Sequence, residues 1–296
     1  MNIRIIPRLD IKGPNLVKGI HMEGLRVLGK PEDFAQYYYE NGADELIYMD
    51  AVASLYGRNS LLKIVEKTAQ EIFIPLCVGG GLRTVDDIRA VLRAGADKVS
   101  INTAAIRRPE LIREASRAFG SSTIVVGIEA IRHPDGKYEP YVNYGRDRTG
   151  LDVFDWAKKA VDLGAGEIVV TSIGQEGTGK GFDLELIKKI SEMVPVPVIA
   201  HGGAGKKSDI FDAVKNGMAD AVSVASILHY KYIEIEKSRM QQEDFKAEGN
   251  IEFLQHGGSV KYIEPASIAE IKSFLIDRQI DCRPPQQKAV DSINAK

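Results

Sequence analysis

Two similar patterns of glycines and small hydroxyl residues constrain the fold of this chain more than any other feature. Val78-Gly79-Gly80-Gly81 with Asn102-Thr103 recurs, about 120 residues later, as Gly202-Gly203 with Ala225-Ser226. An internal repeat of this length indicates a fold built from two similar halves. Glycines and small hydroxyls that follow strands let backbone N–H groups approach an anion closely. The sequence therefore predicts a ligand that carries a phosphate at each end.

Length and composition narrow the class of protein. With 296 residues and a formal net charge of −2, the chain could form one large α/β domain or two average ones. It shows no basic stripe typical of nucleic-acid binding. The two cysteines, Cys77 and Cys282, fit a reducing compartment and lack metal-ligand spacing. We expect a cytoplasmic protein without signal peptide, membrane span, metal or cofactor.

Short β-rich apolar runs alternate with amphipathic stretches of helical periodicity. We expect eight strands, at 3–11, 45–51, 75–78, 98–102, 123–130, 167–173, 196–200 and 221–225. Helices are expected between them, at 32–40, 60–71, 85–94, 108–119, 153–163, 184–193 and 209–216, with a last one at 267–279. Eight strand–helix units and matching halves favour a (β/α)₈ barrel, the TIM-barrel fold, over a doubly wound open sheet.

One segment interrupts this alternation. Residues 231–266 are polar and mixed in charge, and they separate the eighth strand from its helix. Such an insertion is either a solvated surface segment or a lid or docking element beside the active site. We expect a single barrel over residues 1–283, with this insertion, and a disordered tail over 284–296.

Two acidic residues occupy equivalent positions in the two halves. Asp10 ends the first predicted strand, and Glu129 lies at the end of the fifth. In a barrel both would project from the C-terminal face, on opposite sides of one ligand, as a general acid and a general base require. A lone acid at a strand end is more often a partner for a lysine or a backbone amide, but the pair favours catalysis.

The residues predicted to bind phosphate or substrate follow the strand ends. They are Lys18, Gly80, Gly81, Asn102, Thr103, Glu176, Gly177, Gly202, Gly203, Ala225 and Ser226. Lys18 could also depress the pKa of an acid. His201 precedes the second glycine pair and could transfer protons, although a hydrogen-bonded residue at a strand end is the plainer interpretation.

Several longer strings carry a resemblance. They include Leu9-Asp10-Ile11-Lys12, Val78-Gly79-Gly80-Gly81, Gly202-Gly203-Ala204-Gly205 and the run from Gly95 to Ala105. With them the chain resembles the cyclase subunit of imidazole glycerol phosphate synthase over nearly all of residues 3–230. The resemblance implies a (β/α)₈ barrel whose catalytic acids fall on Asp10 and Glu129. It implies a reaction of ammonia with a bis-phosphorylated ribulosyl-formimino-carboxamide ribonucleotide, which gives imidazole glycerol phosphate and an aminoimidazole carboxamide ribonucleotide.

The resemblance also implies a source of ammonia. In the family a glutaminase subunit docks on the N-terminal face of the barrel, and a ring of four charged residues guards the entrance for ammonia. The matching positions hold Arg4, Glu45, Lys98 and Glu167. These four residues could equally form a plain salt-bridge network. An ammonia conduit favours the cyclase over its sister isomerase, which uses no ammonia.

The chain departs from the family pattern on the substrate side. Glu129 stands where the family has aspartate, Gly174 and Glu176 stand where it has two aspartates, and His201 replaces a serine. The insertion has no counterpart in the family pattern. Two alternatives to the cyclase therefore stay open. One is a diverged relative that delivers ammonia to another acceptor, such as a sugar nucleotide for a surface polysaccharide, and the other is a non-catalytic scaffold that activates a glutaminase.

Overall fold

Eight parallel strands form a closed barrel, as the sequence predicts. The computed structural model describes residues 2–53, 61–239 and 262–285. The barrel strands are β1 (Arg4–Lys12), β4 (Leu46–Asp50), β5 (Leu76–Gly79), β6 (Lys98–Ile101), β7 (Ile124–Arg132), β10 (Glu167–Ser172), β11 (Val198–His201) and β12 (Ala221–Val224). Each strand pairs with the next, and β12 pairs with β1 in parallel from Arg4 opposite Ala221 onward, which closes the ring.

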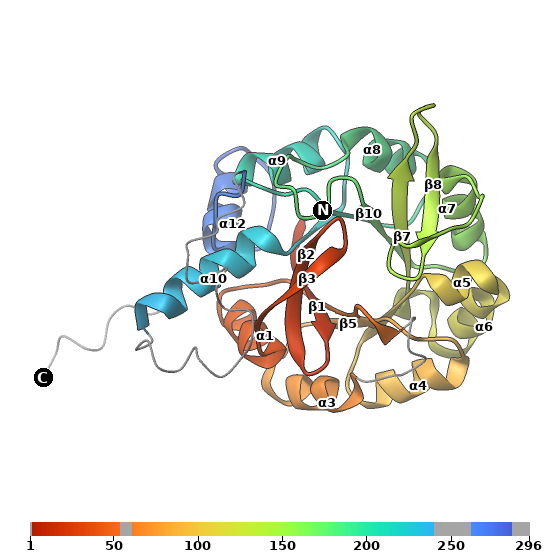
Figure 1. The fold of residues 1–296 in the computed structure, drawn as a ribbon, viewed down its shortest axis with the longest axis horizontal. Helices are drawn as coiled ribbons and strands as arrows, with labels where there is room; N and C mark the ends of the chain where they lie inside the picture. Colours follow the sequence, from red (N-terminus) through yellow and green to blue (C-terminus); the bar gives the residue numbers. More distant parts are fainter. Residues whose placement is uncertain (1, 54–60, 240–261, 286–296) are drawn as a thin grey trace, which may run out of the picture.

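An outer layer of helices surrounds the strands (Figure 1). Its members are α1 (Pro31–Glu40), α3 (Leu62–Glu71), α4 (Val85–Arg93), α5 (Thr103–Arg107), α6 (Glu110–Phe119), α7 (Val153–Asp162), α8 (Leu184–Met193), α9 (Lys207–Lys215), α10 (Ser226–Arg239) and α12 (Ile268–Ile276). A 3₁₀ turn, η1 (Ser121–Thr123), precedes β7. Helix α4 begins with a capping box, because Thr84 accepts from the Asp87 N–H while Asp87 accepts from the Thr84 N–H. The apolar faces of these helices pack on the strands, where Leu9, Val99 and Ile128 are fully buried.

The barrel interior is layered. Alternate residues of β1 point inward, so Arg4, Ile6, Arg8 and Asp10 rise in that order from the N-terminal to the C-terminal face. Ile6 belongs to a separate apolar layer with Ile47, Cys77, Val125, Val169, Ile199 and Ala221. A charged layer lies below this apolar layer and a polar one lies above it, which is the stacked filling expected inside such a barrel.

Two hairpins extend the C-terminal side of the barrel, and the sequence prediction missed both. Strands β2 (Asn15–Ile20) and β3 (Glu23–Gly29) follow β1, and β2 pairs with β1 in antiparallel fashion. Strands β8 (Tyr138–Val142) and β9 (Asp147–Arg148) follow β7 in the same way. An apolar cluster links the two hairpins through Met22, Tyr141 and Tyr144.

The predicted insertion is partly helical. Helix α10 continues to Arg239, so it contains the first residues of the segment 231–266, and Figure 1 shows it running outward from the barrel. On the return, Glu264 donates its backbone N–H to the Gly205 carbonyl at 2.7 Å. Residues 240–261, and residues 286–296 of the predicted tail, lie outside the described residues.

The two cysteines, Cys77 and Cys282, are both free and buried. Within the described ranges no helix has the length and apolar character needed to cross a bilayer.

Candidate active site

The two predicted catalytic acids lie inside the upper part of the barrel. Asp10, in β1, is 5 % exposed, and Glu129, in β7, is 6 % exposed. Asp10 accepts a hydrogen bond from Nε of Arg8 at 2.9 Å. Glu129 accepts one from the Gly145 N–H, also at 2.9 Å. One carboxylate thus has a cationic partner, and the other has a neutral donor.

The difference in partners separates the acidities of the two groups. Burial alone would raise the pKa of Asp10, but the charges of Arg8 and Lys18 outweigh it and lower the pKa below its ordinary value. Burial raises the pKa of Glu129 to about 7, and Arg8 offsets this only in part. Near neutral pH, Asp10 is a carboxylate and Glu129 is about half protonated.

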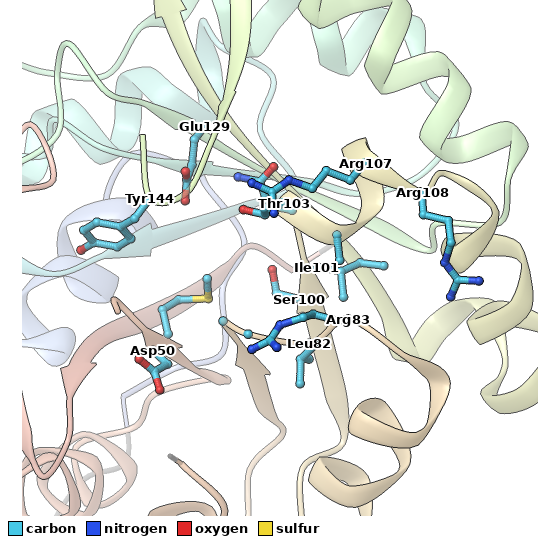
Figure 2. A pocket seen from close by; sticks show the side chains of 15 residues that line it. Asp50, Leu82, Arg83, Ser100, Ile101, Thr103, Arg107, Arg108, Glu129 and Tyr144 are labelled. Atoms are coloured by element: carbon cyan, nitrogen blue, oxygen red, sulfur yellow. The ribbon is translucent and has the colours of Figure 1, made fainter. Parts of the chain in front are cut away.

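A pocket of about 310 Å³ joins Glu129 to the first glycine-rich pattern (Figure 2). Its lining includes Gly80, Gly81, Asn102, Thr103 and Tyr144, so four of the predicted phosphate-binding residues share one cavity with Glu129. A glycine is required at position 80. Its φ is +94°, and an added Cβ would lie 2.5 Å from the Asp50 carbonyl oxygen.

Arginine side chains surround this pocket. Arg83 and Arg107 are exposed and line it, and Figure 2 shows the Arg107 guanidinium directed toward Thr103. Arg108 turns outward in the same view and pairs with Glu114 at 2.9 Å. Positive charge beside a glycine loop suits a phosphate group.

The second glycine-rich pattern lies at the ends of β11 and β12. Gly202 and Gly203 have φ of +90° and +115°, and a Cβ on Gly203 would lie 2.0 Å from the Gly181 carbonyl oxygen. Ala225 and Ser226 follow β12, and Ser226 is the first residue of α10. The predicted residues of each half thus gather at the C-terminal ends of that half's strands.

Two predicted substrate-binding residues contact each other. Lys18 and Glu176 form a buried ion pair, and Lys18 Nζ also donates to the Gly19 carbonyl at 2.6 Å. The other Glu176 oxygen accepts from the Met22 N–H at 2.9 Å. An added Cβ on Gly177 would lie 2.6 Å from the Gly19 carbonyl oxygen. The loop after β10 is therefore fastened to the β2–β3 hairpin.

His201 lies in the polar layer at the end of β11. Its Nδ1 lies 3.0 Å from the Ser223 carbonyl oxygen, so Nδ1 carries the proton and donates it. Burial lowers the pKa of His201 to about 3. The imidazole is neutral at physiological pH, and its buried Nε2 has no hydrogen-bond partner among the described residues.

The four residues predicted to guard the ammonia entrance meet at the N-terminal end of the barrel. Arg4 pairs with Glu45 at 2.6 Å and with Glu167 at 3.2 Å. Lys98 pairs with the same two glutamates, at 3.0 and 3.1 Å. Because β10 is not a neighbour of β1 or β6 in the sheet, these contacts cross the barrel interior and form a closed charged ring.

Two residues of the upper layer were not predicted from the sequence. Arg8 contacts Asp10, and the buried Tyr144 lines the pocket beside Glu129. Arg8 could have been found, because it stands two residues before Asp10 in a strand and therefore shares its face. Tyr144 could not, since it reaches the site from the β8–β9 connection, where it has a positive φ of 59°.

Comparisons with known proteins agree with this geometry. The model of the family described as "Histidine biosynthesis protein" matches residues 4–234. "Imidazole glycerol phosphate synthase subunit HisF" of Legionella pneumophila is 60% identical over 205 residues, covering 69% of this chain and 97% of the relative. Proteins of the same name from Methanocaldococcus jannaschii and Alkaliphilus metalliredigens are 49% and 47% identical, over 79% and 78% of this chain and 93% and 92% of their own lengths.

Proposed function

Because this chain belongs to the histidine biosynthesis protein family, we propose that it is the cyclase subunit of an imidazole glycerol phosphate synthase. Its substrate is then a bis-phosphorylated ribulosyl-formimino-carboxamide ribonucleotide, and its second substrate is ammonia. The products are imidazole glycerol phosphate and an aminoimidazole carboxamide ribonucleotide.

One observation carries this proposal: two buried carboxylates of different acidity lie between two glycine-rich strand ends. A ligand with a phosphate at each end would place its middle against Asp10 and Glu129. One phosphate would lie at Gly80, Gly81 and Thr103, and the other at Gly202, Gly203 and Ser226. Backbone N–H groups at strand ends and helix starts suit both phosphates.

The two acids supply what the chemistry requires. Ammonia condenses with the keto carbon of the ribulosyl group, which requires removal of protons from nitrogen and protonation of the departing oxygen as water. The new nitrogen then closes the ring on the formimino carbon, and the bond from that carbon to the amine of the aminoimidazole carboxamide breaks as the amine takes up a proton. Loss of a proton from the former ribulosyl methylene makes the imidazole ring aromatic. Asp10, ionised at neutral pH, is the base in this scheme, and Glu129, with a pKa of about 7, is the acid.

We propose that ammonia arrives from a glutaminase partner on the N-terminal face, giving a heterodimer. The charged ring of Arg4, Glu45, Lys98 and Glu167 supports this role, because it closes the barrel interior at that face directly below the apolar layer. The free cysteines support a cytoplasmic location.

The first test needs no partner subunit. The purified chain is mixed with the ribonucleotide and an ammonium salt at alkaline pH, where free ammonia is abundant, and loss of the substrate is followed. We expect turnover by the wild-type chain and a loss of at least about a hundredfold in Asp10→Asn. A folded wild-type sample that leaves the substrate intact would refute the proposal and direct attention to other ammonia acceptors.

A further inference from the structure

Arg8 is a buried cation that crosses the barrel interior. It is 3 % exposed, its Nε donates to Asp10 at 2.9 Å, and its Nη1 donates to Thr171 Oγ1 at 3.3 Å. Thr171 belongs to β10, which pairs with β7 and β11 and not with β1. The Arg8 side chain therefore crosses the barrel interior, and its guanidinium is hydrogen-bonded to Asp10 in β1 and to Thr171 in β10.

The position of Arg8 gives it unequal contact with the two acids. Asp10 receives a charge-assisted hydrogen bond from it, whereas Glu129 feels its charge without a hydrogen bond. Glu129 instead receives the neutral Gly145 N–H. A guanidinium stays protonated at every physiological pH, and its planar fork keeps a fixed direction once two of its nitrogens are bound.

The remaining groups around the two carboxylates contribute less to this inequality than Arg8 does. Lys18 and His201 face Asp10, but Lys18 is already paired with Glu176, and His201 is neutral. The Tyr144 phenol lies near both acids and is kept protonated, because burial raises its pKa well above its ordinary value. Among these neighbours, Arg8 is the cation bonded directly to a proposed catalytic acid.

We propose that Arg8 is a positioning residue that gives the two acids different roles. It holds Asp10 as a permanent carboxylate and leaves Glu129 to carry the exchangeable proton. This assignment rests on the proposed function, since it concerns the same two carboxylates. It adds a residue that acts through its hydrogen bond to Asp10 and not as an acid or a base itself.

The test is a titration that requires no substrate. Carboxyl carbons of Asp and Glu are labelled with ¹³C, and the Asp10 and Glu129 signals are assigned with the Asp10→Asn and Glu129→Gln variants. In the wild-type chain we expect the Glu129 signal to titrate with a midpoint near pH 7 and the Asp10 signal to stay ionised down to acidic pH. Arg8→Met removes a positive charge that favours both ionised forms, so both midpoints should rise. The Asp10 midpoint should rise by about one pH unit or more, and by more than the Glu129 midpoint, because only Asp10 loses a hydrogen bond as well.

Two variants control this experiment. Arg8→Lys keeps the charge and should return the Asp10 midpoint toward the wild-type value. Arg89→Met removes an exposed arginine that pairs with Asp86, and it should leave both midpoints in place. Unchanged midpoints in folded Arg8→Met would show that Arg8 is merely structural and would overturn the proposal.

A second variant keeps the proposal testable if Arg8→Met does not fold. Thr171→Val leaves every charge in place and removes the hydroxyl that holds Nη1, so the Glu129 midpoint should shift by about half a pH unit or more. A midpoint that stays in place would count against Arg8. Because these readouts need no turnover, failure of the ammonium assay would retire the proposed function without deciding the role of Arg8.

Discussion

At the scale of single residues, the site depends on the raised pKa of one carboxyl group, that of Glu129. Glu129 has a pKa of about 7 because burial outweighs the charge of Arg8 and the hydrogen bond from Gly145. A group with this pKa is protonated below neutral pH and loses its proton above it. It can therefore serve as a general acid, and its protonated fraction declines as the pH rises through 7.

Replacing the acid should remove that pH dependence. Glu129→Gln replaces the carboxyl group with an amide of the same size that cannot give up a proton in this role, so kcat should fall by about 10²- to 10⁴-fold. In the wild-type chain the rate, divided by the concentration of free ammonia, should decline above about pH 7. A steady-state pH profile checks both points, and a wild-type profile that stays flat from pH 6 to 9 would contradict the assignment.

The arginines beside the first glycine-rich loop lead to a second prediction at the residue scale. Arg83→Gln and Arg107→Gln each remove a positive charge that lines the pocket. We expect KM for the ribonucleotide to rise by about tenfold, equivalent to about 1.4 kcal/mol, with kcat little changed. Arg89→Gln is the matched control on the surface of α4. Equal KM values in all variants would show that phosphate does not bind at this end.

At the scale of elements, the β8–β9 connection positions part of the site from a distance. Glu139 in β8 accepts from Arg148 Nη2 at 2.9 Å, from the Gly150 N–H at 2.7 Å and from His133 Nε2 at 2.7 Å. Its hydrogen bonds, above all the one from Arg148, lower the pKa of Glu139 to about 2. The connection so fixed carries Gly145, the donor to Glu129.

A substitution that loosens the β8–β9 connection should change the pKa of Glu129. Glu139→Gln weakens the hydrogen bonds that hold the connection, so the Gly145 donor should be less well placed. We expect a lower kcat, a nearly unchanged KM, and a pH profile whose limb near 7 moves to higher pH, because a donor that favours the carboxylate is weakened. Asp135→Asn, in the turn before β8, is the control. If the limb in Glu139→Gln coincides with that of the wild type, the connection does not tune Glu129.

The sequence predicts the elements of the barrel well and the hairpins poorly, for a physical reason. Apart from charged residues such as Arg8 and Asp10, the barrel strands are apolar runs, from Ile5 in β1 to Val222 in β12, because both of their faces are buried. This pattern is visible without a structure. The β2–β3 and β8–β9 hairpins have mixed, polar sequences. Contacts such as Met22 and Tyr141 in their shared cluster stabilise them, and those contacts join segments far apart in the chain.

At the scale of the whole molecule, the barrel separates two charged sites with an apolar layer. The ring of Arg4, Glu45, Lys98 and Glu167 lies at one end, and the proposed catalytic pair lies at the other. The repeat in the sequence predicts the site at the C-terminal end, since each half supplies one acid and one glycine-rich strand end. The Arg8 contact to Thr171 could not be predicted, because it depends on which strands face each other across the closed barrel.

Because the apolar layer separates the two sites, we predict that a substitution in the charged ring leaves turnover with ammonium salt intact. Lys98→Met leaves Glu45 and Glu167 with one cation between them, so the free energy of unfolding should fall by about 2 kcal/mol, between the values for exposed and buried pairs. Urea denaturation measures this loss, and turnover with ammonium salt should stay near the wild-type rate. Lys67→Met, whose pairing with Glu32 is exposed, should cost less than about 1 kcal/mol. A collapse of ammonium-driven turnover in folded Lys98→Met would contradict the separation.

The most direct test of the account follows the nitrogen atom. The chain is incubated with ¹⁵N-labelled ammonium and the bis-phosphorylated ribonucleotide, and both products are analysed by mass spectrometry. We predict one ¹⁵N in the imidazole ring of imidazole glycerol phosphate, none in the aminoimidazole carboxamide ribonucleotide, and at least about a hundredfold less of both products from Asp10→Asn. Unlabelled imidazole glycerol phosphate, or labelled product formed by Asp10→Asn at the wild-type rate, would be the contradicting result.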